Sequence, residues 1–116
     1  MQIHLSPRHL KLTDAIHSFV GEKIAHLETI SGQIIAAHVV LIHDEHADPE
    51  KRHHVKVHLA VPGKDIHGED TEADLYAAID KVTSKLARQL RKRKTRLIDK
   101  NKQKVQKSVE RKKMGV

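Results

Sequence analysis

Basic residues recur along one predicted helix at a spacing that suits phosphate binding. Residues 74–96 read DLYAAIDKVTSKLARQLRKRKTR, with cations at steps of three or four residues. At 100° per residue such positions share one side of a helix, and neighbouring side chains lie about 5–6 Å apart. We call this set the basic row, and its members are Lys81, Lys85, Arg88, Lys92 and Arg96. It could bind successive phosphates of a polyanion.

The same helix carries an apolar stripe on its opposite side. These positions also recur at helical spacing, so the stripe is predicted to pack on a core and to hold the basic row toward solvent. Its members are Leu75, Ile79, Val82, Leu86, Leu90 and Leu97.

Charge is strongly segregated along the 116-residue chain, whose net charge is +7. Residues 1–84 contain 8 Lys and Arg against 13 Asp and Glu, a net charge of −5, whereas residues 85–116 contain 14 against 2, a net charge of +12. Charge concentrated on one helix and its extension is typical of polyanion binders. The alternative is that the basic segment is only a solvated helix end.

Eleven histidines suggest a metal site, but their spacing does not support one. No HExxH motif is present, and His43 and His46 fall in a predicted turn. We therefore expect no metal ligands and interpret the histidines, such as His54 and His58, as exposed on an open sheet face. Some imidazoles could become cationic beside RNA and add a pH-dependent increment to binding.

No group of residues indicates catalysis or stacking of nucleic-acid bases. The chain lacks a recognisable nucleophile with a base, a paired-carboxylate pocket or a glycine-rich phosphate loop, so we predict no catalytic residues, no cofactor and no enzyme activity. Phe19 and Tyr76 are the only Phe, Tyr or Trp residues, and both lie in helical patterns where a core or near-core role is expected. Binding should therefore use phosphates and the shape of folded RNA or duplex.

The remaining pattern predicts four strands and a second helix. A helix from Thr13 or Asp14 to Gly32 repeats apolar residues at spacings of three and four. The third strand alternates most clearly, with Val55, Val57, Leu59 and Val61 on one side. The predicted strands are 2–6 (ended by Pro7), 34–44, 54–61 and 64–70, with Pro62-Gly63 as a turn and Thr71 and Asp74 approximating a capping box of the last helix.

This order, β-α-β-β-β-α, predicts an α+β two-layer sandwich with both helices on one face of a four-stranded sheet. The same layout occurs in double-stranded-RNA-binding domains. We expect one domain over residues 1–97 and a basic, flexible tail over residues 98–116. The sequence has no cysteine, no secretory signal pattern and no apolar run near the roughly 18–20 residues of a membrane span, so we expect a cytoplasmic protein.

Residues around the last helix resemble the bacterial ribosome hibernation-promoting factor family, also called ribosome-associated inhibitors or sigma-54 modulation proteins. The most specific part is Ile66-His67, followed after an acidic turn by DLYAAIDKVTSKLARQL, in which Asp74 and the residues from Tyr76 to Asp80 reproduce a D-[LM]-Y-A-A-I-D signature. The resemblance covers roughly residues 1–97, and the length is similar to the family's short forms.

The resemblance implies a domain that binds the small ribosomal subunit in the channel used by messenger and transfer RNA. It would inhibit translation and preserve idle ribosomes under stress or in stationary phase, without a small-molecule substrate or membrane, and would be monomeric when free. The implied ribosomal RNA contacts are Lys81, Lys85, Arg88, Arg91, Lys92 and Arg96, with Arg8 and Lys23 as secondary contacts.

Two other function classes stay open at this point. A general RNA- or DNA-binding protein would use the same basic row without preferring ribosomes. A small histidine-dependent nuclease or metalloprotein would need RNA cleavage or bound metal.

Overall fold

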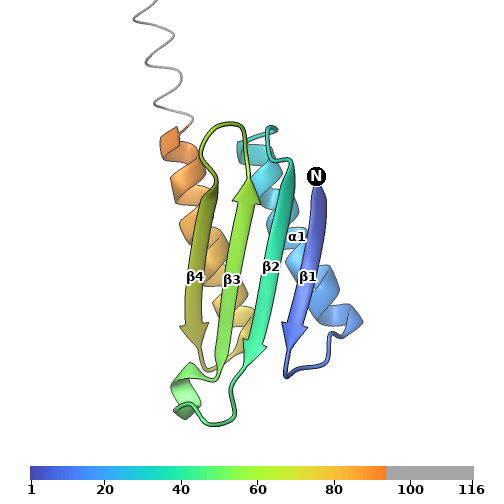
Figure 1. Cartoon of the computed structure of the whole chain (residues 1–116), viewed down its shortest axis with the longest axis vertical. Coiled ribbons are helices and arrows are strands. Elements are labelled where there is room, and N and C mark those ends of the chain that lie inside the picture. Colours follow the sequence, from blue (N-terminus) through green and yellow to red (C-terminus); the bar gives the residue numbers. More distant parts are fainter. Residues whose placement is uncertain (94–116) are drawn as a thin grey trace, which may run out of the picture.

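The computed structural model describes residues 1–93, which form a four-stranded sheet covered on one face by two helices (Figure 1). Arg96, Leu97 and the tail 98–116 lie outside the described residues. The elements in chain order are β1 (Gln2–Arg8), α1 (Asp14–Ile30), β2 (Ala36–His43), the 3₁₀ helix η1 (Pro49–Lys51), β3 (His53–Ala60), β4 (Ile66–Glu72) and a helix over residues 75–93.

The sheet runs in the order β1-β2-β3-β4. β1 pairs with β2 in parallel, because α1 crosses over between them, whereas β2, β3 and β4 pair antiparallel through short connections. Gly63, in the predicted turn between β3 and β4, has a φ of 88°, a value that glycine adopts without strain. The predicted element order and α+β sandwich are confirmed.

The core lies between the inner face of the sheet and the two helices. The four inward residues predicted on the third strand are all buried, and Val39 and Leu41 of β2 face the same way. From helix 75–93, the five described members of the apolar stripe are also buried: Leu75, Ile79, Val82, Leu86 and Leu90. Period-two alternation in the strands and 3.6-residue spacing in the helix therefore meet in one core.

Pro7 does not end the first strand as predicted. β1 continues to Arg8, and Pro7 is paired with Leu41 of β2. Proline lacks an N–H donor, but β1 is an edge strand, and an edge strand tolerates a residue that cannot donate outward.

The predicted N-terminal cap is confirmed for one helix and wrong for the other. Thr13 caps α1 as expected, because its hydroxyl accepts a hydrogen bond of 3.2 Å from the Ile16 N–H. The predicted capping box of the last helix is wrong. Thr71 belongs to β4, where its hydroxyl bonds to His54, and Asp74 alone accepts from the Ala77 N–H at 3.2 Å.

Helix 75–93 packs closely on β4 because Gly68 has no side chain. A Cβ placed there would lie 3.3 Å from Val82 and 3.4 Å from Leu86, both on the buried face of the helix. The absent side chain thus sets how near the helix lies to the sheet.

We predict that Gly68→Val destabilises the fold by about 1–3 kcal/mol, because the branched side chain would overpack this contact. Gly21→Ala in α1 is the matched control. No atom outside the adjacent backbone lies within 4 Å of a Cβ there, so alanine should stabilise the helix by about 0.5–1 kcal/mol. Urea unfolding followed by circular dichroism measures both. Equal stabilities of Gly68→Val and the unmodified protein would contradict the close packing.

Candidate nucleic-acid interface

Helix 75–93 exposes the four described members of the basic row, as its apolar face predicted. The row does not have uniform surroundings, however. Its first two lysines lean over β4, whereas its last two cations line a groove that α1 also borders.

Lys81 and Lys85 are neutralised by acidic residues of β4. Lys81 donates a hydrogen bond to the Glu72 carboxylate, and this bond raises the pKa of Lys81. The Lys85 ammonium lies 3.5 Å from a carboxylate oxygen of Asp70 and donates to the Glu69 carbonyl at 3.2 Å. A phosphate at either lysine must therefore compete with protein oxygens.

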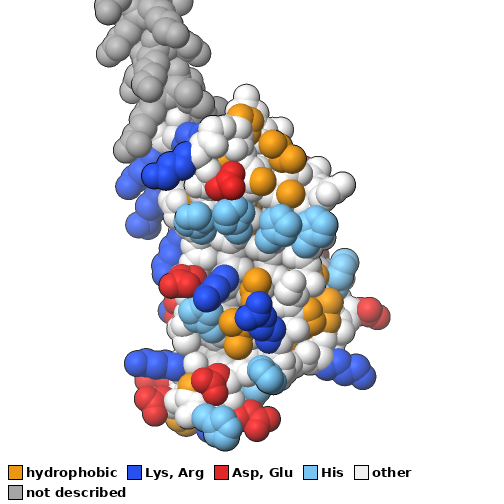
Figure 2. Space-filling model, in the orientation of Figure 1, with side chains coloured by type: hydrophobic (Ala, Val, Ile, Leu, Met, Phe, Trp, Pro, Cys, Tyr) orange, Lys and Arg blue, Asp and Glu red, His pale blue; other side chains and the backbone are white. Residues whose placement is uncertain are grey.

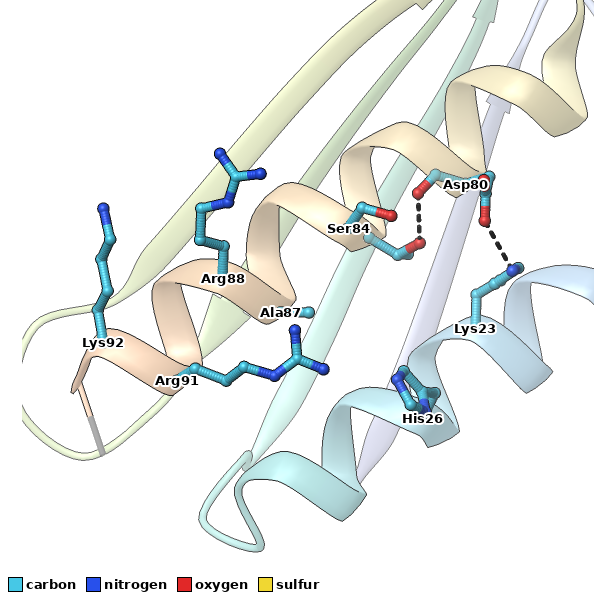
Figure 3. A pocket seen from close by; sticks show the side chains of 9 residues that line it. Lys23, His26, Asp80, Ser84, Ala87, Arg88, Arg91 and Lys92 are labelled. Atoms are coloured by element: carbon cyan, nitrogen blue, oxygen red, sulfur yellow. Dashed lines mark hydrogen bonds and ion pairs between the residues drawn. The ribbon is translucent and has the colours of Figure 1, made fainter. Parts of the chain in front are cut away.

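Arg88 and Lys92 instead line, together with Arg91, a groove between α1 and helix 75–93, which we call the interhelix groove. In Figure 3 the Arg91 side chain extends toward α1, whereas Arg88 and Lys92 extend from the outer side of their helix. The groove has a volume of about 700 Å³. Four cations line it together with one carboxylate, one imidazole and small residues: Lys23, Arg88, Arg91, Lys92, Asp80, His26, Thr83, Ser84 and Ala87. The sequence separates Lys23 from Arg88 by 65 positions, and the fold brings them to one groove.

Asp80 is the acidic residue of the interhelix groove and holds Lys23 in place. The Lys23 ammonium lies 2.7 Å from a carboxylate oxygen of Asp80 (Figure 3) and 5.4 Å from the centre of the Phe19 ring. Phe19 in turn meets Tyr76 edge to face at 5.0 Å, which links the two helices. Phe19 is partly buried against the core, as expected, whereas Tyr76 is 38% exposed and so lies at the margin of the core rather than within it.

The floor of the interhelix groove consists of small residues of helix 75–93. Thr83 and Ala87 are buried, and the Thr83 hydroxyl donates to the carbonyl oxygens of Ile79 and Asp80 at 3.0 and 2.9 Å. Small side chains at a spacing of four leave room above them for a ligand. Neither this floor nor His26 was predicted from the sequence, although the four-residue spacing of Thr83 and Ala87 places both on one side of the helix.

Of the remaining predicted contacts, Arg8 is separated from the groove and Arg91 is part of it. Arg8 is exposed at the end of β1 on the side of His4, opposite the inward Leu5, and so faces away from the helices. Arg91, which the basic row did not include, lines the groove.

Among residues 1–93, no group of three or more His, Asp or Glu side chains is arranged to hold a metal ion. Within the same residues, no helix is both long and apolar enough to cross a membrane.

The fold and the groove define a class: small α+β domains with a cationic channel between two helices on one face of the sheet. Residues 3–98 match the family described as sigma 54 modulation protein / S30EA ribosomal protein, and the chain belongs to this family.

Relatives in two bacteria illustrate the similarity. The chain is 44% identical over 97 residues to the ribosome hibernation promotion factor of Deinococcus radiodurans, a match that covers 83% of this chain and 51% of the relative. It is 38% identical over 98 residues to the ribosome hibernation promoting factor of Escherichia coli, covering 84% and 97% of the two chains. The chain thus spans about half the length of the Deinococcus relative.

Solved structures show the same fold. The N-terminal domain of Thermus thermophilus Protein Y matches with a TM-score of 0.69 at 31% identity, over 79% of this chain and 98% of that domain. A ribosomal subunit interface protein from Coxiella burnetii matches with a TM-score of 0.70 at 22% identity, over 82% and 99% of the chains, which supports the fold alone.

We predict that Asp80→Asn raises the affinity for a double-stranded RNA about two- to fivefold. The substitution removes the carboxylate of the interhelix groove and releases Lys23 for phosphate contact. Because the Lys23 and Asp80 side chains are 36% and 54% exposed, their ion pair should contribute less than about 1 kcal/mol to stability. Fluorescence anisotropy at about 0.1 M salt measures the affinity.

Asp48→Asn is the control, because it makes the same charge change on an exposed residue just before η1. If both variants bind equally tightly, the charge of Asp80 does not limit binding at the groove.

Proposed function

We propose that this chain is a ribosome hibernation factor that binds ribosomal RNA of the small subunit. The observation that carries the proposal is the interhelix groove, which Arg88, Arg91 and Lys92 line together with Lys23 of α1 in a chain of this family. Its relatives named as hibernation factors match over the same residues that form the groove.

The proposed mechanism is occlusion rather than catalysis. Cations held by a rigid helix pair contact successive phosphates without reorganising, so the domain docks on folded RNA by shape and charge. Seated in the channel of messenger and transfer RNA, it would exclude both and keep the ribosome idle. This mechanism needs no cofactor, small molecule or membrane. The protein would act in the cytoplasm and would be monomeric when free.

The cations should contribute unequally. Arg88 and Lys92 border the groove from the outer side of their helix, and a phosphate that reaches them displaces mainly water. Lys81 and Lys85 must first leave the oxygens of β4, so part of any gain from RNA is offset. Lys23 is intermediate because it is paired with Asp80. Arg8 faces away from the groove and is a secondary contact, and Arg96 is proposed from the sequence alone.

A general RNA- or DNA-binding role is the second candidate, favoured by the same cationic groove and by the absence of a described base-reading element on residues 1–93. Competition separates the two. We predict that the protein stays with small ribosomal subunits during sucrose-gradient sedimentation when bulk transfer RNA is present in about tenfold excess over ribosomal RNA mass. Loss of the protein to the competitor fraction would favour the general binder, because phosphate contacts alone do not discriminate between RNAs.

We predict that Arg88→Gln with Lys92→Gln makes the slope of log affinity against log salt less steep by about 1.4–1.8, since each lost phosphate contact contributes about 0.7–0.9 to its magnitude. Lys81→Gln with Lys85→Gln is the matched control on the same helix. It removes the same charge, but the magnitude of its salt slope should fall by less than about half of the fall expected for the Arg88 and Lys92 variant. Binding to small subunits at several salt concentrations gives both slopes, and equal losses would refute the unequal division.

A further inference from the structure

A row of four histidines crosses the open face of the sheet, one from each strand. His4 of β1 pairs in register with His38 of β2, His38 with His58 of β3, and His58 with His67 of β4. Neighbouring ring centres lie 4.8, 6.3 and 5.0 Å apart. Figure 2 shows these side chains as a band across the sheet, with basic side chains beside its β4 edge. We call this set the histidine row.

Hydrogen bonds join the side chains at the β4 end of the histidine row. The Nδ1 atoms of His58 and His67 lie 3.1 Å apart, so one ring donates and the other accepts. His58 Nε2 lies 2.8 Å from the Asp65 carboxylate, and this hydrogen bond lowers the pKa of Asp65. The carboxylate favours a proton on Nε2, which leaves Nδ1 of a neutral His58 to accept from His67. When both rings carry two N–H groups, their Nδ1 atoms cannot bond to each other, and the His67 N–H can then donate to an anion.

Two hollows connect this row to the interhelix groove. A hollow of about 540 Å³ beside the β3–β4 turn shares Lys92 with the groove and is also lined by Lys64, Arg93 and His67. A hollow of about 420 Å³ on the open sheet face shares His67 with it and is lined by His38, His58 and Lys56. Basic side chains therefore lead from the groove, around the β4 edge, to the histidine row.

We propose that the sheet face is a second RNA-binding surface, on which the histidine row and the basic residues around the β4 edge bind backbone phosphates with uptake of protons. The proposal deepens the proposed function and rests on it, because the RNA strand would reach the sheet face from the interhelix groove. The stacked arrangement of His4 and His38, at an interplanar angle of 10°, leaves ring edges rather than ring faces for the ligand. Ring nitrogens on those edges suit phosphates better than stacked bases.

The charges around the row set the direction of its pH dependence. Lys56 and Lys64 favour an anion there, as do Lys92 and Arg93 at the β4 edge, whereas Asp65 and Glu69 oppose it. Glu69 lies 3.5 Å from His54, one step further along the sheet. In the described strands, the register positions adjoining the row carry no other charged side chain. Added protons are therefore needed before the face is clearly cationic.

The affinity for purified small ribosomal subunits, measured at constant ionic strength, tests this inference. Between pH of about 7.5 and about 6.0 imidazole gains most of its charge, and uptake of somewhat less than one proton gives a rise of about tenfold. We expect that rise in the unmodified protein and a rise below about twofold in His38→Gln with His67→Gln. His17→Gln with His46→Gln removes two exposed histidines elsewhere and should keep the tenfold rise.

A second variant tests the path independently of pH. Lys64→Gln should make the slope of log affinity against log salt less steep by about 0.7–0.9, which is the contribution of one phosphate contact. If the histidine-row variant keeps the full pH dependence, or if Lys64→Gln keeps the full slope, the second surface is wrong while the groove and the proposed function stand. If the unmodified protein binds subunits at neither pH, the proposed function fails, and this inference fails with it.

Discussion

The contact between helix 75–93 and the sheet is the constraint on which the rest of the structure depends. Val82 and Leu86 lie against Gly68, and the apolar stripe fills the space between helix and strands. Because that face must be buried, the rotation of the helix about its axis is fixed. The side of the helix on which each cation lies is then determined, whether toward β4, toward α1 or outward to solvent.

This rotation divides one regular row of cations into two chemical environments. Glu72 and Asp70 lie within reach of Lys81 and Lys85, so that end of the helix is held by intramolecular ion pairs. At the other end, Asp80 is the one acidic residue among residues 1–93 that lines the interhelix groove, and it is paired with Lys23. The result is a surface whose positive potential is concentrated where two helices meet, a geometry suited to a phosphate backbone that follows a groove.

The open sheet face follows from the same layering. With both helices on one side, the outward positions of all four strands remain free of packing, and side chains at matching register positions become neighbours about 5 Å apart. Histidine at four matched positions produces a row that no single strand contains. Asp65, in the β3–β4 turn, anchors one end of the row through His58.

The sequence by itself determined the element order, the inward faces of the strands and the buried stripe of the last helix, because hydrophobic periodicity is local and reads directly as burial. It also predicted Arg88 and Lys92 as phosphate contacts, and both residues line the interhelix groove. It misplaced Pro7 and Thr71, since strand ends depend on what the neighbouring strand offers. Only the tertiary structure decided which cations are paired with carboxylates, which of them share a groove with Lys23, and which histidines lie side by side. Those relations join residues far apart in the chain, and their energies depend on distances that no local pattern specifies.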